Sequence, residues 1–118
     1  MSNPLLQRML AAREAWVQLP GARDGLQVRV RRPAEAQMPG LLLKGELEDY
    51  LGWVVGWKGF TEADVLGARQ GSDAAVPFDP ALWREIALDH VAWCKAVADQ
   101  IKAMCEAFVG AKEAASGN

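Results

Sequence analysis

Apolar residues recur at helical spacing near the start of the chain. Between residues 4 and 18 they stand mostly three or four positions apart, as Leu6, Met9, Leu10, Trp16 and Val17. Asn3 and Pro4 are typical of a helix start, and Pro20 with Gly21 interrupts a helix. We therefore expect a first helix over residues 4–18.

The middle of the chain carries a second amphipathic pattern, between residues 46 and 57. Its apolar positions follow the spacing i, i+3, i+4, i+7 and i+8, as Leu47, Tyr50, Leu51, Val54 and Val55. Three carboxylates in the first turn complement the positive end of a helix dipole. The pattern predicts a second helix, which Gly56 and Gly59 end.

The last third of the chain predicts two further helices. Asp79 and Pro80 repeat the helix-start signal, and a bend is expected near Asp89 and His90 before the last helix. The apolar stripe of that last helix consists of Trp93, Cys94, Val97, Ile101, Met104, Cys105 and Phe108. Little apolar surface follows Gly110, so we expect fraying there and a flexible tail at residues 113–118.

One segment has the period of a strand, because residues 26–31 alternate between apolar and polar side chains. No other segment alternates as well. Its partner could be residues 17–19, residues 41–43, or a strand of another subunit.

These patterns predict an α+β, mainly α fold of three to four helices with a small β-strand or ribbon near residues 26–32. Residues 34–38 are expected to form one helical turn, and residues 61–78 a long loop with one turn. A chain of 118 residues buries roughly two-thirds of its unfolded surface, enough for one core. We expect a single globular domain over residues 1–112.

Charge is nearly balanced over the whole chain, at −2, but it is unevenly placed. Residues 1–44 hold seven Lys and Arg against three Asp and Glu, whereas residues 45–118 hold six against twelve. Such a chain could associate head to tail, could contact an anion through its basic part, or could simply carry scattered solvated charges. A homo-oligomer is therefore one expectation.

Neither a membrane span nor a signal sequence is visible. No segment approaches roughly 18 consecutive apolar residues, and the cytoplasm is the expected location. Cys94 and Cys105 lie eleven positions apart in one predicted helix. This spacing corresponds to about 16 Å along the axis, too far for a disulfide or a shared metal, so buried reduced thiols are expected.

The sequence contains little sign of catalytic chemistry. His90 is the single histidine, and no serine or cysteine stands in a recognisable nucleophile motif. The carboxylates between residues 46 and 64 fit helix-start and loop positions, and the glycines lack the lysine of a phosphate-binding loop. We expect no enzyme, no catalytic residue, no metal and no cofactor.

Aromatic residues form the most distinctive cluster of the sequence. On a helix, Trp53 and Trp57 would share one face, rotated away from the apolar stripe. Two interpretations stay open: the helix is central and packed on both sides, or Trp53, Trp57 and Phe60 form a surface that binds a partner.

The order of several segments resembles the small tail assembly proteins of long-tailed phages and prophages, and most closely the tail assembly chaperones. The resemblance covers residues 4–108. It consists of the leading NPLLQRMLAAREAWVQL, the strand VRVRRPAEAQM, then VVGWKGFTEADVLG and VPFDPALWREI before a final helix. Residues 67–75 and the short charged tail are additional to the family pattern.

The resemblance implies a non-enzymatic protein of the bacterial host cytoplasm that binds the tape measure protein during tail morphogenesis. A tape measure protein is a long helical chain whose apolar segments aggregate unless they are covered, and helix-in-groove binding would cover them. Another small phage structural or connector protein is the first alternative. A nucleic-acid-binding regulator that uses the arginines of residues 23–32 is the second.

Overall fold

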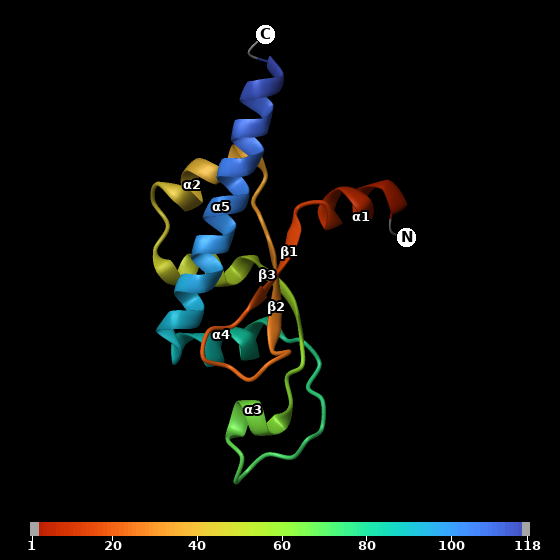
Figure 1. Ribbon diagram of the computed structural model, residues 1–118, viewed down its shortest axis with the longest axis vertical. Coiled ribbons are helices and arrows are strands. Elements are labelled where there is room, and N and C mark those ends of the chain that lie inside the picture. The colour runs from red at the N-terminus through yellow and green to blue at the C-terminus, as the bar shows by residue number, and fades with distance from the viewer. Residues whose placement is uncertain (1–2, 117–118) are drawn as a thin grey trace.

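The computed structural model describes residues 3–116 and shows an α+β fold, mainly α, with one small three-stranded antiparallel sheet (Figure 1). This confirms the predicted fold class, although the helices within residues 3–116 outnumber the three to four expected. The elements in chain order are α1 (Pro4–Ala11), β1 (Glu14–Gln18), β2 (Gln27–Arg31), the 3-10 helix η1 (Glu35–Gln37), α2 (Met38–Leu42), the 3-10 helix η2 (Leu47–Trp53), β3 (Val54–Lys58), α3 (Glu62–Leu66), α4 (Pro80–Leu88) and α5 (Val91–Ser116).

The sheet has β2 at its centre, with β1 and β3 antiparallel on either side. Val28 pairs with Val17 of β1 and with Trp57 of β3. The register between β2 and β3 shifts so that Val55 is an extra residue, a β-bulge. The strand predicted at residues 26–31 is confirmed as β2. One of its two partners, β1, includes residues 17 and 18 of the segment 17–19 that was expected as a possible partner.

The predicted helix over residues 4–18 is wrong beyond Ala11, because residues 14–18 form the edge strand β1. Val17 and Leu19 are buried, whereas Trp16 and Gln18 are exposed, which is the period of a strand. The backbone of β2 provides hydrogen-bond partners that no local pattern reveals. Tertiary pairing therefore overrides the helical spacing.

The predicted helix over residues 46–57 is also wrong, because a 3-10 helix and a strand replace it. Glycine and two adjacent β-branched valines weaken a helix here, and Val54 pairs with Val30 across the sheet. The backbone N–H of Glu46 donates to the Asp49 carboxylate at 2.7 Å and fixes the start of η2.

The remaining expectations mostly agree with the structure. Residues 35–37 form the expected turn and lead directly into α2, and Asp79 caps α4 through the backbone N–H of Leu82. The expected bend near His90 is a break between α4 and α5. α5 continues past Gly110 to Ser116, so the first four residues of the tail expected at 113–118 are helical, and residues 117–118 lie outside the described part.

The long segment at residues 61–78 is closed at its base by backbone hydrogen bonds. Thr61 caps α3 and forms a β-bridge with Ala75, and the Val76 N–H donates to the Phe60 carbonyl at 3.0 Å. The Ser72 hydroxyl donates to the Glu62 carboxylate at 2.7 Å. The segment is thus a loop with a narrow neck, and α3 is the single turn expected within it.

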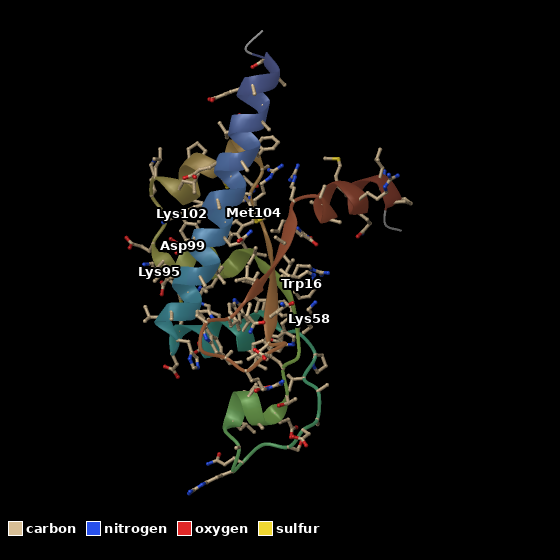
Figure 2. The ribbon with its side chains drawn as sticks, in the orientation of Figure 1. Trp16, Lys58, Lys95, Asp99, Lys102 and Met104 are labelled. Carbon is tan, nitrogen blue, oxygen red and sulfur yellow. The ribbon has the colours of Figure 1, made fainter. Side chains whose placement is uncertain are left out.

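The core lies between one face of the sheet and the helices α4, α5 and η2. Its most deeply buried large side chains are Leu19, Val28, Val30, Leu51, Trp83, Val97 and Ile101. α5 packs on η2, on α4 and on the strands β1 and β2, while α1 extends away from this body (Figure 1). Lys95, Asp99 and Lys102 recur on the exposed side of α5 (Figure 2). The stripe predicted for the last helix is therefore confirmed.

Candidate functional site

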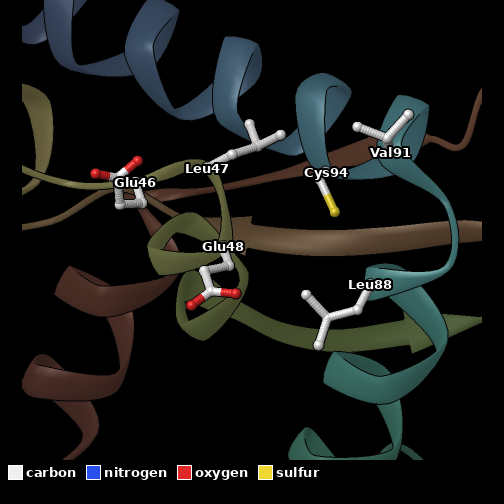
Figure 3. Close-up of a pocket in the computed structure, with 6 residues that line it drawn as sticks. All are labelled: Glu46, Leu47, Glu48, Leu88, Val91 and Cys94. Atoms are coloured by element: carbon white, nitrogen blue, oxygen red, sulfur yellow. The ribbon is translucent and has the colours of Figure 1, made fainter.

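A hollow of about 380 Å³ opens where η2 meets the junction of α4 and α5. Figure 3 shows the six side chains that line it, Glu46, Leu47, Glu48, Leu88, Val91 and Cys94. Leu47 is the first residue of η2, Leu88 the last of α4 and Val91 the first of α5. The site therefore exists only because three element ends meet at one place.

Three large apolar side chains remain exposed around this hollow. Val91 is 71% exposed, and Leu88 and Leu47 are also exposed although the core lies directly beneath. The helical conformation is interrupted at Asp89 and His90, between α4 and α5. Leu88 and Val91 lie on either side of this interruption and point outward. Burying a fully exposed Val or Leu side chain gains about 1.5–3 kcal/mol, and Leu47 and Leu88, exposed to 39% and 43%, would gain less. A cluster of three exposed apolar side chains is nevertheless typical of a contact surface.

The rim of the hollow is acidic. Glu46 and Glu48 lie on the η2 wall (Figure 3), and Arg84 approaches Glu48 at 3.5 Å with both side chains about half exposed. Exposed pairs of this kind are weak and leave the carboxylates available to a partner. An apolar segment flanked by Lys or Arg would match this surface.

Cys94 at the base of the hollow is a buried, free thiol. Its Sγ lies 3.1 Å from the Ala87 carbonyl oxygen, and burial raises the pKa of the Cys94 thiol. Burial likewise raises the pKa of Cys105, which is also free. Both thiols stay protonated at neutral pH and behave as small apolar side chains, as predicted.

The predicted binding residues Trp53, Trp57 and Phe60 do not form one helical face. Trp57 stacks on Phe60 with ring centroids 4.2 Å apart and meets the edge of Phe78 at 5.2 Å. Its indole N–H donates to the Val76 carbonyl at 2.7 Å. Phe60 is only 2% exposed, and Trp53, at the end of η2, is half-buried. The structure thus brings Trp57 and Phe60 into contact, with Phe60 buried and Trp53 and Trp57 partly exposed.

Of the four arginines considered for nucleic-acid binding, Arg29 and Arg31 lie on the outer face of the sheet. Arg23 lies in the β1–β2 turn, and Arg32 follows β2, with its guanidinium 3.9 Å from the Phe108 ring of α5. Arg31 and Arg29 lie 2.6 and 3.4 Å from the carboxylate of Glu14. The Arg23 guanidinium pairs with Asp64 at 2.7 Å. Three of the four arginines are therefore already matched by carboxylates of the same chain.

Trp16 lies on the same outer face, between two cations. The Lys58 ammonium is 4.3 Å from its ring, and Figure 2 shows these two side chains near each other. The Arg29 guanidinium is 5.6 Å from the same ring. Cation–π contacts of this kind hold the exposed indole in place. The two cations that contact the indole are also the positive charges that a phosphate group would need.

Leu88 and Val91 were missed by the sequence patterns. Both fall outside the apolar stripes of their helices, and their exposure depends on the angle at the α4–α5 break. The one signal in the sequence was the presence of large apolar residues off the stripe, on both sides of the expected bend.

Within residues 3–116, no three side chains of His, Cys, Asp or Glu lie close enough together to hold a metal ion. None of the helices described there combines the length and apolarity needed to cross a bilayer. No protein-family model matches the chain, and no curated protein or solved structure does so either.

Proposed function

We propose that this protein is a non-enzymatic tail assembly chaperone of a long-tailed phage or prophage, and that it binds apolar helical segments of the tape measure protein in the host cytoplasm. The observation that carries the proposal is the exposed apolar hollow between η2, α4 and α5. The segment order of residues 4–108, which resembles that family, supports it.

The hollow suits part of a helix better than a whole small ligand. Its volume of about 380 Å³ is near the lower end of ligand pockets, which span about 300–1,000 Å³. A partner helix presents anchoring side chains at i, i+3, i+4 and i+7, and one or two of these would fill the hollow. Leu47, Leu88 and Val91 would then cover the flanks of the partner helix.

The acidic rim adds a preference about the sequence of the partner. Glu46 and Glu48 would attract Lys or Arg beside the apolar anchors and would repel acidic flanks. The site predicted at Trp53, Trp57 and Phe60 is replaced in this proposal by Leu47, Leu88 and Val91, because Phe60 is not accessible.

Co-expression with the tape measure protein tests the proposal. The wild-type protein should co-purify with it and keep it soluble, and Val91→Lys should lose both effects because it places a charge in the apolar contact. The matched control is Leu66→Lys, at an exposed leucine of α3 that does not line the hollow.

Two results would contradict the proposal. One is a wild-type protein that neither co-purifies with the tape measure protein nor improves its solubility. The other is recovery of this protein from purified virions, which would favour a structural or connector protein instead.

A further inference from the structure

The N-terminal helix α1 is formed, but it buries none of its side chains against the rest of residues 3–116. None of its residues is buried; Leu5 is 64% exposed, and Leu6 and Met9 are each about half exposed. The Asn3 side chain caps the helix by accepting from the N–H groups of Leu5 and Leu6, at 2.9 and 3.3 Å. An isolated helix of two turns is marginal in water, so this apolar face indicates a missing contact.

A complementary apolar groove lies between α2 and α5. It consists of two adjoining hollows of about 320 Å³ each, which share Leu42 and Val109. Leu43 at its border is 81% exposed, the highest value among the exposed large apolar residues of the described chain. The remaining lining residues are Glu35, Met38, Pro39, Cys105, Glu106, Gly110 and Glu113.

The charges of the helix and the groove are opposite. α1 carries Arg8 in its last turn and has no acidic residue in its first turn. Of the groove carboxylates, Glu35 pairs with Lys112, whereas Glu106 and Glu113 have no ion-pair partner within residues 3–116. Docking would place Arg8 against an acidic border, and this complementarity favours α1 as the occupant of the groove.

The helix and the groove of one copy point in different directions. Two residues connect α1 to β1. The backbone N–H of Arg32 donates to the Arg13 carbonyl at 2.9 Å, and this bond fixes the direction in which α1 leaves the sheet. In Figure 1, α1 extends to one side of α5 while α2 lies on the other. The groove is thus open to a neighbouring molecule.

We propose that α1 of one copy docks in the α2–α5 groove of a second copy, and that the second copy returns its own α1 to give a two-fold symmetric dimer. Such an exchange forms the contact between α1 and the groove twice, so the dimer buries twice the area of a single contact. The dimer surface does not include the hollow at η2, α4 and α5, so this inference goes beyond the proposed function and can fail independently of it.

Sedimentation equilibrium of the full chain tests the exchange. The wild-type protein should be a dimer, and Leu6→Lys or Leu43→Lys should each raise its dissociation constant about tenfold or more. All three positions are exposed, so the control Leu66→Lys should fold equally well and should stay dimeric. A monomeric wild-type protein, or equal behaviour of all three variants, would overturn the proposal.

Charge reversal tests the pairing of the two surfaces. Arg8→Glu should weaken the dimer, and combining it with Glu106→Arg and Glu113→Arg should restore the association. Absence of any rescue would overturn the assignment of α1 to this groove.

Cysteine trapping distinguishes exchange between copies from folding back within one copy. A Met9→Cys chain mixed with a Leu43→Cys chain of different size should form a disulfide between the two chains. A bridge that appears only when both substitutions are in one monomeric chain would refute the exchange.

Discussion

Three tryptophans connect distant parts of the chain through their indole N–H groups. Trp83 donates to the Leu51 carbonyl at 3.2 Å and Trp93 to the Pro20 carbonyl at 2.9 Å, while Trp57 donates to Val76. Each ring is at least half-buried, so each residue combines apolar packing with one long-range hydrogen bond. Their role in this chain is the joining of elements.

Trp57→Ala should therefore lower the stability of the fold. We expect a loss of about 2–3 kcal/mol in the free energy of unfolding, from the lost stacking on Phe60 and the unpaired Val76 carbonyl. Trp57→Phe should lose less, because it retains an aromatic ring. Urea unfolding measures both. If the variant kept wild-type stability but lost binding to the proposed partner, Trp57 would belong to the binding surface.

Asp64 makes stability depend on pH. The Arg23 guanidinium, together with the Thr61 N–H and hydroxyl, holds the pKa of Asp64 at about 2, below its ordinary 3.8. The carboxylate therefore binds protons more weakly in the folded state. The contribution of this carboxylate to the free energy of unfolding is complete above about pH 5 and is lost as the pH falls from about 4 through 2.

Asp64→Asn should reduce stability at pH 6 by about 1–2 kcal/mol, a value reduced by solvent screening at the half-exposed Arg23. The difference between wild type and variant should shrink as the pH is lowered towards 2. Urea midpoints at several pH values measure it. A difference that does not change with pH would contradict the charged pair as its cause.

At the scale of elements, the end of β3 is held by a close approach of two backbones. Gly59 has φ of +87°, and a Cβ at this position would lie 2.4 Å from the Gly25 carbonyl oxygen in the β1–β2 turn. The Arg23 side chain also donates to the Gly59 carbonyl. Only glycine satisfies both the backbone angle and the space.

Gly59→Ala should cost about 2 kcal/mol or more, whereas Gly52→Ala should be neutral or stabilising by up to about 1 kcal/mol. Gly52 lies in η2, where an added Cβ would meet no atom within 4 Å and φ is not positive, so it is the matched control. Thermal unfolding compares the two. Similar losses for both would show that the close approach is unimportant.

Among the helices and strands, some could be predicted from the local sequence and others could not. Helix caps at Asn3 and Asp79 and the strand at β2 depend on nearby residues, and all three were predicted correctly. β1 and β3 were assigned to helices because valines and tryptophans in those segments fit both a helical and an alternating period. Both segments are strands because they pair with β2. β3 is distant from β2 in the sequence, and the segment of β1 was only one of the expected partners of β2.

The candidate site was less predictable than the fold, for a related reason. Leu88 and Val91 are exposed because α4 and α5 meet at an angle, and an angle between helices follows from core packing that local patterns do not contain. Trp57 and Phe60 were rightly grouped together. The side of the sheet on which Trp57 lies follows from the strand β3 that carries it, and the local pattern did not predict that strand.

The whole molecule is elongated, with extents of 59 × 34 × 23 Å and a radius of gyration of 16.0 Å. A compact domain of this length would have a radius of gyration of about 13–14 Å. Figure 1 shows three parts that project from the body: the end of α5, the loop around α3 at the opposite end of the long axis, and α1 to one side.

Small-angle X-ray scattering of the monomeric Leu6→Lys variant should give a radius of gyration close to that of the extended structure. The reason is that α1 buries no side chain against the rest of residues 3–116. A value near that of a compact domain would show that α1 folds back, and would also count against the exchanged dimer.

The narrow neck of residues 61–78 separates the apex of this loop from the rest of the molecule. The bridge between Thr61 and Ala75 and the bond from Val76 to Phe60 fix both ends, while Ala68 and Arg69 at the apex are exposed. Doubling a loop beyond such a neck costs only about 0.6 kcal/mol in closure entropy. The apex is therefore where the chain can be lengthened at little cost, and where a peptide tag or fluorophore can be inserted without disturbing either proposed surface.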